Sequence, residues 1–141
     1  MTRLPKHPFS ISAPGILLAL LASPLAAQIP IGGTQTGTLP AGVYHTTGTL
    51  TVPVGQTFLL SPGAIIKFTN SGHELSVNGT LVANGTALNP VILTDDADDS
   101  AGGDTNANGP SVGSPTAWRG VVFASTASAS SLTYTDVRYG G

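Results

Sequence analysis

The feature that most limits how this chain can fold is a succession of short runs in which apolar and polar residues alternate. Each run is bounded by Gly, Pro or Asn, in stretches such as "PVG", "SPG" and "NG". Alternation with a period of two is typical of strands with one buried face, and these turn residues favour tight corners. After residue 27 no segment keeps a helical period. The sequence predicts an all-β fold, with these positions facing one core: Leu50, Val52, Val54, Ala64, Ile66, Phe68, Leu75, Val77, Leu81 and Ala83.

A weak internal echo suggests how the strands are arranged. The stretch "GTLTV" from Gly48 recurs as "GTLVA" from Gly79, 31 residues further on. Strands and corners that return at such a spacing favour a solenoid, in which successive coils stack on each other. A hairpin-built β-sandwich or barrel is the competing all-β interpretation.

The end of the chain favours the solenoid. In "SLTYTDVRYGG", Leu132 and Tyr134 alternate and Val137 and Tyr139 alternate, but the step between the two pairs is three residues. The break leaves no room for a hairpin reversal. A sharp bend that redirects the strand keeps both pairs facing inward, as a parallel β-helix requires. A β-bulge would produce the same change of phase.

The stretches "LPAGVYHTTGTLTVPVGQTFLLSPGAIIKF", "LSVNGTLVANGTALNPVILT", "WRGVVF" and "LTYTDVRYGG" together carry a family resemblance. They resemble the start of secreted bacterial right-handed parallel β-helix proteins, the pectin-lyase-like superfamily in the broad sense. The resemblance implies β-helix coils over residues 38–141. It also implies an N-terminal fragment whose helix is incomplete at the C-terminus, because such proteins usually continue for several coils. The group includes adhesins, structural surface proteins and carbohydrate-active enzymes, so it does not fix a function.

The first 27 residues have the layout of a secretory signal peptide. Arg3 and Lys6 precede an apolar run at 16–22 that is too short to span a bilayer, and small residues lead to an expected cut after Ala27. Residues 28–37 are expected to be a linker. The chain has no cysteine, so an exported form cannot rely on disulfides. We expect a secreted or cell-surface protein.

Charge excludes one class of partner. Beyond residue 27 the cations are Lys67, Arg119 and Arg138, against Glu74 and six Asp, which gives a net charge of 3 − 7 = −4. Nucleic-acid binding needs clustered Lys and Arg and is therefore not expected. No second apolar stretch approaches the length of a membrane span.

A long acidic loop at 95–116 is the most distinctive polar segment. Asp104, Asn106 and Asn108 alternate before Gly109, as in the first half of a D-x-[DN]-x-[DN]-G calcium loop, but Pro115 stands where a bidentate Glu belongs. Five closely spaced Asp repel one another unless they are solvated or share a cation. The alternatives are a solvated loop that binds nothing and a structural Ca²⁺ site, whose candidate ligands are Asp95, Asp96, Asp98, Asp99, Asp104, Asn106 and Asn108.

Few other residues suggest chemistry. His45 and His73 are expected in exposed turns, and Arg119 is expected to pair with an acid or cap a strand end. Trp118 is expected either to fill the core or, at the exit of the loop, to stack on a sugar. Tyr134 and Tyr139 are expected mainly as core fillers. The chain lacks G-x-S-x-G, H-E-x-x-H and phosphate-binding glycine motifs.

These observations favour a non-catalytic secreted or cell-surface module with a structural, adhesive or carbohydrate-binding role, whose partners are extracellular polysaccharide or cell-surface components. The first alternative is the N-terminal part of a polysaccharide lyase or glycoside hydrolase whose catalytic coils are missing from this chain. A β-sandwich carbohydrate-binding domain with a calcium site is a further alternative.

Overall fold

The computed structural model describes residues 28–141, and this part of the chain consists of strands, turns and loops without a helix. The predicted all-β class is confirmed. The signal peptide expected at 1–27 lies outside the described residues. The strands are β1 (Ile29–Thr34), β2 (Gly37–Leu39), β3 (Gly42–Val52), β4 (Thr57–Leu60), β5 (Ala64–Phe68), β6 (Leu75–Val77), β7 (Thr80–Asn84), β8 (Val91–Asp95), β9 (Val121–Phe123), β10 (Ser131–Thr133) and β11 (Thr135–Val137).

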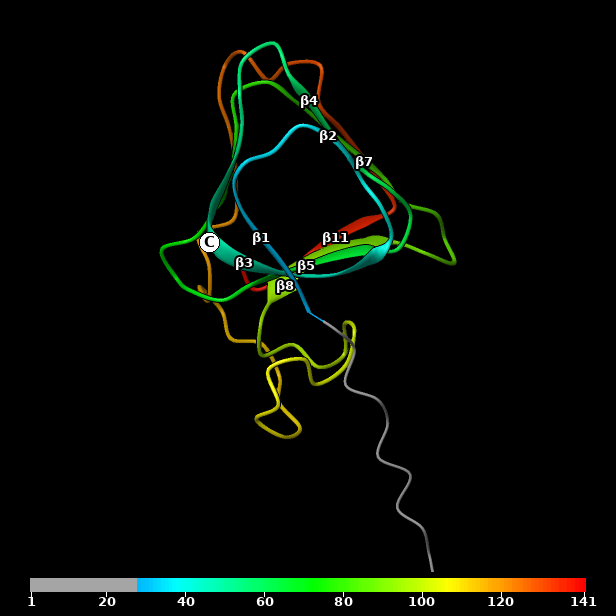
Figure 1. The fold of residues 1–141 in the computed structure, drawn as a ribbon, viewed down its shortest axis with the longest axis vertical. Coiled ribbons are helices and arrows are strands. Elements are labelled where there is room, and N and C mark those ends of the chain that lie inside the picture. Colours follow the sequence, from blue (N-terminus) through cyan, green and yellow to red (C-terminus); the bar gives the residue numbers. More distant parts are fainter. Residues whose placement is uncertain (1–27) are drawn as a thin grey trace, which may run out of the picture.

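The strands form two parallel sheets that curl around one core. The seven-stranded sheet has the order β11-β8-β5-β3-β6-β9, with β1 also paired to β3, and the four-stranded sheet has the order β10-β7-β4-β2. Every pairing between these strands is parallel. Seen down the shortest axis, the strands outline a triangle (Figure 1). The predicted parallel arrangement is confirmed, and the hairpin-built alternative is wrong for the described strands.

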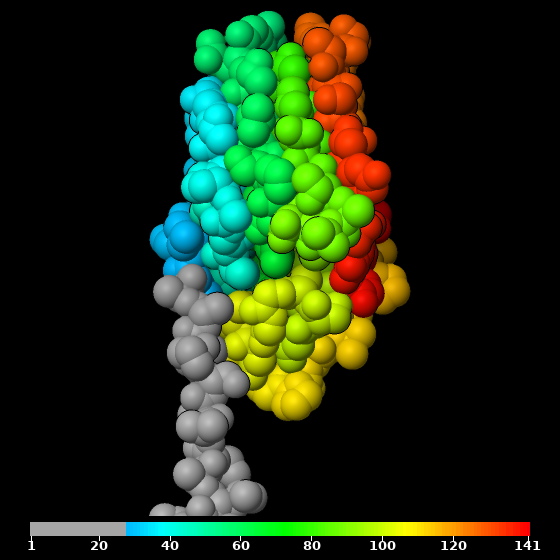
Figure 2. Space-filling model, turned by 90° about the vertical axis from the view of Figure 1, so that its right-hand side faces the viewer, coloured from blue at the N-terminus to red at the C-terminus, as the bar shows by residue number. Residues whose placement is uncertain are grey.

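Strand β3 produces much of the curl because it pairs with two different neighbours along its length. Its first part, Gly42–His45, pairs with β5, and its last part, Leu50–Val52, pairs with β6. The strand therefore runs around a corner of the triangle. The strands of the four-stranded sheet lie side by side as stripes on the surface, from cyan at β2 through green at β4 and β7 to red at β10 (Figure 2).

The core is a column of side chains contributed by equivalent positions of stacked strands. Ile66 is paired in register with Tyr44 on one side and with Leu93 on the other, and all three side chains are buried. Parallel pairing in register keeps such residues on the same face, since side chains alternate along each strand. All ten positions predicted to face the core are buried except Val54, which lies in the turn before β4 and is exposed.

A sharp corner near the end of the chain matches the predicted change of phase. β10 belongs to the four-stranded sheet and β11 to the seven-stranded sheet, with only Tyr134 between them. Tyr134 has a φ of 44°, a left-handed conformation that turns the chain within one residue. The predicted bend is confirmed. The expectation that Tyr134 fills the core is wrong, because its side chain is 61% exposed at the corner.

Two other expectations about organisation are corrected by the pairing. Residues 28–37, expected to be a linker, contain β1, which pairs with β3, and the first residue of β2. The echo between Gly48 and Gly79 does not mark stacked coils: the end of β3 pairs with β6, whereas β7 pairs with β4. The two stretches have similar sequences because each adjoins a similar corner, on different sides of the triangle. Within the described residues no helix is long and apolar enough to cross a membrane.

The corner before β7 gives the first prediction. A Cβ built on Gly79 would overlap the carbonyl oxygens of Pro53 and Gln56, whereas one built on Gly48, within β3, meets nothing within 4 Å. Gly79→Ala should lower the free energy of unfolding by about 1–3 kcal/mol, because backbone must shift to admit the methyl group. Gly48→Ala should cost less than about 0.5 kcal/mol. Denaturant unfolding, followed by the fluorescence of the single tryptophan, measures the free energy of unfolding of both variants. Equal losses of stability would contradict the close backbone packing at this corner.

Candidate functional site

A row of three polar residues crosses the outer face of the seven-stranded sheet. His45 of β3 is paired in register with Lys67 of β5, and Lys67 with Thr94 of β8. Each follows a core residue by one position, so it points away from the core. All three side chains are nevertheless buried, with Lys67 and Thr94 fully covered. Something other than the core must therefore cover this face.

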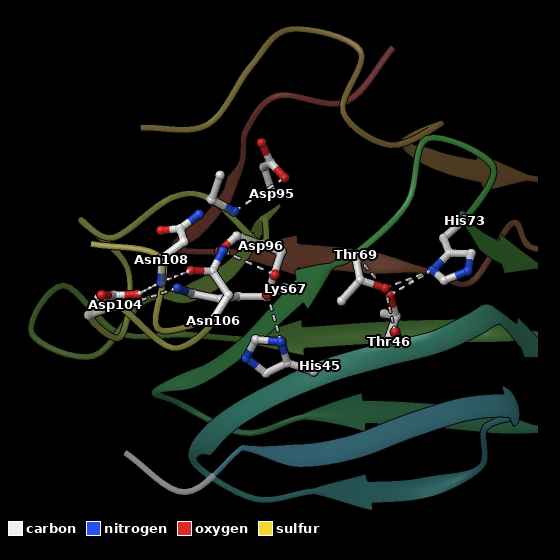
Figure 3. Close-up of polar contacts among 12 residues, drawn as sticks. His45, Thr46, Lys67, Thr69, His73, Asp95, Asp96, Asp104, Asn106 and Asn108 are labelled. Carbon is white, nitrogen blue, oxygen red and sulfur yellow. Dashed lines mark hydrogen bonds and ion pairs between the residues drawn. The ribbon is translucent and has the colours of Figure 1, made fainter. Parts of the chain in front are cut away.

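The cover is the acidic loop, which leaves β8 and folds back over the outer row (Figures 1 and 3). Lys67 Nζ donates a hydrogen bond to the carbonyl oxygen of Gly103, 2.8 Å away. A Cβ on Gly102, whose φ is +74°, would lie 2.8 Å from the side chain of Val43 and 3.7 Å from that of Ile65. The loop thus packs directly against outward-facing residues of β3 and β5.

Lys67 is a buried cation beneath the acidic loop, and within residues 28–141 it attracts the carboxylates electrostatically without forming an ion pair with any of them. Burial lowers the pKa of Lys67, and the negative charges of Asp96, Asp99, Asp98 and Asp104 act in the opposite direction, with a net decrease. A buried ammonium group is costly unless carboxylates and hydrogen bonds surround it. The sequence predicted that these aspartates are either solvated or close to a cation, and Lys67 supplies a nearby positive charge from the outer face of the sheet.

Several carboxylates of the loop hold its backbone. Asp95 accepts a hydrogen bond from the backbone N–H of Ser114 at 3.0 Å. Asp99 accepts from the backbone N–H of Ser111 at 2.6 Å and from its hydroxyl at 3.2 Å. These contacts tie the first part of the loop to its return. The two carboxylates therefore order the loop by local hydrogen bonding.

Asp98 is the most deeply buried acid and joins the loop to β8 and β11. Its carboxylate accepts hydrogen bonds from the Thr94 hydroxyl at 2.7 Å and the Ser100 hydroxyl at 2.5 Å, and lies 3.4 Å from Nη1 of Arg138. Burial alone would raise the pKa of Asp98. The hydrogen bonds from Ser100 and Thr94 and the charge of Arg138 outweigh burial and lower it. Asp98 is thus held as a buried, ionised anchor of the loop.

The alternating residues Asp104, Asn106 and Asn108 form a tight turn. The backbone N–H of Asn108 lies 3.3 Å from Oδ1 of both Asp104 and Asn106, and the N–H of Gly109 donates to Asp104 at 3.0 Å. The Asn106 amide donates to the Asp96 carboxylate at 3.3 Å. The side-chain oxygens of this turn therefore accept hydrogen bonds from N–H groups of the protein itself. In residues 28–141 no group of three or more His, Cys, Asp or Glu side chains could hold a metal ion.

His45 lies within β3 rather than in an exposed turn, so that expectation is wrong. Its side chain is 7% exposed, and Nδ1 lies 2.6 Å from Oδ1 of Asp96 (Figure 3). A nitrogen and an oxygen approach this closely with a proton between them. Burial lowers the pKa of His45; the charge of Asp96 opposes this change, and the charge of Lys67 adds to it. His45 therefore directs Nδ1 to the loop and leaves Nε2 free of that contact.

A pocket of about 720 Å³ lies between the start of β1, the outer face of β3 and the acidic loop. His45 and Asp96 line it, together with Thr105 and Asn106 of the loop. Three buried polar atoms of this lining have no hydrogen bond among the described residues: His45 Nε2, Thr105 Oγ1 and Asp96 Oδ1, although Asp96 Oδ1 lies 2.6 Å from Nδ1 of His45. The pocket is open to solvent on one side and is lined by polar groups that have no hydrogen-bond partner among the described residues.

The remaining candidates lie apart from the pocket. Trp118 is fully buried, stacks on Phe68 with ring centroids 3.9 Å apart, and donates from its indole nitrogen to the carbonyl of Arg138 at 2.8 Å. It fills the core, and no ring face is open to a sugar. Arg119 is 66% exposed and lies 3.6 Å from Glu74, which agrees with the expected pairing with an acid.

His73 and Asp136 are structural in this arrangement. Nδ1 of His73 lies 2.9 Å from the hydroxyl of Thr46, at the turn between β5 and β6. Asp136 accepts a hydrogen bond from Nη2 of Arg138 at 2.8 Å. Neither residue lines the pocket beside His45.

Sequence reasoning missed Lys67 and Thr105 as site residues. Lys67 alternates with core residues, which places it on the opposite face of its strand but does not show that this face is covered. A signal was present, because Lys67 is the only lysine after residue 27 and lies on the strand that pairs with β8, from which the acidic loop departs. The position of Thr105 depends on how the loop folds back, which local pattern does not encode.

The chain matches no protein-family model, no curated protein and no solved structure. The resemblance to pectin-lyase-like proteins therefore has no support from a relative. The architecture that the structure shows is coarser: an all-strand chain whose parallel sheets curl around a core.

Removing the buried cation gives the second prediction. Lys67→Met keeps most of the aliphatic volume but leaves the surrounding carboxylates without their shared charge. It should cost about 1.5–3 kcal/mol, because it removes the charged hydrogen bond to the Gly103 carbonyl. Arg119→Met is a matched control that removes an exposed cation and should cost less than about 1 kcal/mol.

Denaturant unfolding measures both variants, and limited proteolysis of residues 96–111 reports whether the loop still covers the sheet. Lys67→Met should expose the loop to cleavage under native conditions, whereas Arg119→Met should not. Equal stability losses and unchanged cleavage would contradict the role given to Lys67.

Proposed function

We propose that residues 38–141 form coils of a right-handed parallel β-helix that serves as a non-catalytic, secreted or cell-surface module with a structural, adhesive or carbohydrate-binding role. The observation that carries this proposal is the parallel, in-register stacking of every described strand around one core. Such stacking repeats the same outer surface from coil to coil, which suits an extended, repetitive ligand. The resemblance to secreted β-helix proteins points the same way.

The four-stranded sheet offers the flat surface for such a ligand. Thr38, Leu59, Val82 and Ser131 are paired in register across its four strands. Each of the four lies next to a core-facing position, so the row points outward. The acidic loop covers the seven-stranded sheet instead, so this row stays accessible. Hydroxyl and aliphatic groups together can bind the polar and C–H faces of a sugar chain.

A binding role is favoured over catalysis by how the acids are used. Hydrolysis of a glycosidic bond by the usual route needs two carboxylates facing each other across the scissile bond. Asp98 and Asp99 instead accept hydrogen bonds within the loop, and Glu74 pairs with Arg119. The alternative, an N-terminal part of a polysaccharide lyase or glycoside hydrolase, then requires catalytic groups from outside residues 28–141.

Export is the part of the proposal that rests on sequence alone. The basic start, the short apolar run at 16–22 and the small residues before position 28 predict a signal peptide. The absence of cysteine is compatible with an oxidising compartment, because no thiol is present to mispair.

The third prediction tests polysaccharide binding. Residues 28–141 should be retained by insoluble cell-wall or plant polysaccharides without releasing reducing ends or unsaturated products. Val82→Asp places a charge in the outward row and should reduce retention severalfold, whereas Val112→Asp, at an exposed position of the loop, should leave it unchanged. Product release would favour the enzyme alternative, and no retention on any polysaccharide would contradict a carbohydrate-binding role.

The fourth prediction concerns Ca²⁺, which the alternating Asp104 and Asn residues suggested. The oxygens of this turn face backbone N–H groups, so the arrangement does not present a ready ligand set. If the loop takes up Ca²⁺, the ion should raise the unfolding temperature of the parent chain but not that of Asp104→Ala. Identical unfolding temperatures in Ca²⁺ and in chelator would remove the calcium site and leave Lys67 as the cation of the loop.

A further inference from the structure

We propose that the pocket above His45 binds a small, neutral, polyhydroxylated molecule of the size of a mono- or disaccharide, held by His45 Nε2 and Thr105 Oγ1. The pocket lies on the outer face of the seven-stranded sheet, away from the row around Val82. The proposal names a discrete ligand for the carbohydrate-binding role proposed above, and it rests on that role for the class of ligand.

The two unpartnered polar atoms are the first argument. His45 is 7% exposed and Thr105 is 2% exposed, so neither is freely solvated. Among residues 28–141, neither Nε2 of His45 nor Oγ1 of Thr105 has a hydrogen-bond partner. Buried polar groups in native proteins are almost always hydrogen-bonded, so each exception needs an explanation. Both residues line the same pocket, so a molecule bound there is the nearest source of the missing partners.

The chemistry of the two atoms indicates hydroxyl groups. Nδ1 of His45 directs its proton to Asp96, at 2.6 Å, so a neutral ring leaves Nε2 as an acceptor. The ligand must therefore donate a proton there. The Thr105 hydroxyl can donate or accept. A molecule with neighbouring hydroxyls offers a donor to His45 and either role to Thr105.

The rest of the wall favours a neutral ligand with apolar faces. Asp96 is the only acid in the lining and repels an anion, while the buried Lys67 ammonium is committed to the Gly103 carbonyl beneath the loop. Pro30 and Ala107 add apolar surface that can pack against C–H groups. A pocket of about 720 Å³ falls in the range of small-molecule sites, which are typically apolar with a few convergent polar groups.

Other hydroxyls near the pocket already have hydrogen-bond partners within the chain, unlike the hydroxyl of Thr105. The Thr69 hydroxyl donates to the carbonyl of Thr46 at 2.7 Å, and the Thr46 hydroxyl accepts from the backbone N–H of Thr69 at 3.2 Å. Those threonines hold β3 against the end of β5. Thr105 has no comparable task within the described residues, so its hydroxyl is free to act on a ligand.

The test follows the histidine rings by NMR in the full chain, whose histidines are His7, His45 and His73. Neutral glucose, galactose, xylose, sucrose and glycerol are titrated up to about 100 mM, well above a Kd near 1 mM. Galacturonate and glucosamine are the anionic and cationic probes. At least one neutral sugar should shift the ¹⁵Nε2 resonance of His45, leave His73 unchanged and bind more tightly than either charged probe.

Thr105→Val removes the hydroxyl while keeping the shape, and exposed Thr57→Val in β4 is the matched control. Thr105→Val should weaken sugar binding about tenfold or more, the effect of losing one good hydrogen bond. Its unfolding midpoint should be equal to or above that of the parent, because the hydroxyl has no internal partner. Thr57→Val should leave binding unchanged.

Three outcomes would overturn the proposal: no neutral probe moves the His45 signals, a charged probe binds better than every neutral one, or Thr105→Val destabilises the chain while binding persists. Failure here is distinct from failure of the proposed function. If retention on polysaccharide depends on Val82 but no sugar shifts the His45 signals, the pocket ligand is contradicted and the carbohydrate-binding module is supported. If sugars shift the His45 signals but the chain is not retained on polysaccharide, the pocket ligand is supported and the extended binding surface around Val82 is contradicted.

Discussion

Parallel pairing in register is the constraint on which the rest of the structure depends. Because β3, β5 and β8 run in the same direction and pair residue for residue, each inward position lies beside an inward position of its neighbour. The same rule that places Ile66 beside Leu93 in the core places Lys67 beside Thr94 on the outer face. One register therefore defines both the apolar column and the polar row that the acidic loop covers.

The acidic loop and the outer row that contains Lys67 carry opposite charges and stabilise each other. An acidic, glycine-rich loop would be solvated by itself, and a fully buried lysine would be costly by itself. Together they give a loop fixed over the outer face through Lys67, Asp98 and Arg138. The space that remains beside His45 is the pocket. A site forms here because two features that are each unfavourable alone are brought together by strand order.

Much of the fold could be predicted from sequence, and less of the site. Period-two alternation identified the core residues, with Val54 as the exception at a turn, and the change of phase around Tyr134 located a corner without a reversal. These features are local. The burial of His45 and Lys67 could not be read from their own strands, because it depends on a loop that leaves β8 and returns across the sheet. The similar stretches that begin at Gly48 and Gly79 do not lie on paired strands, since similar corners recur on different sides.

A designed disulfide tests the register most directly, because the chain has no cysteine of its own. Ile65 and Ile92 are Cα partners on β5 and β8. Adjacent strands lie about 4.8 Å apart, within the range a disulfide spans. Ile65→Cys/Ile92→Cys should oxidise to an intramolecular cross-link under native conditions, detected by mass. Ile65→Cys/Leu93→Cys, one residue out of register and on opposite faces of the sheet, should stay reduced. Equal cross-linking of both pairs, or cross-linking of the second pair alone, would contradict the parallel register.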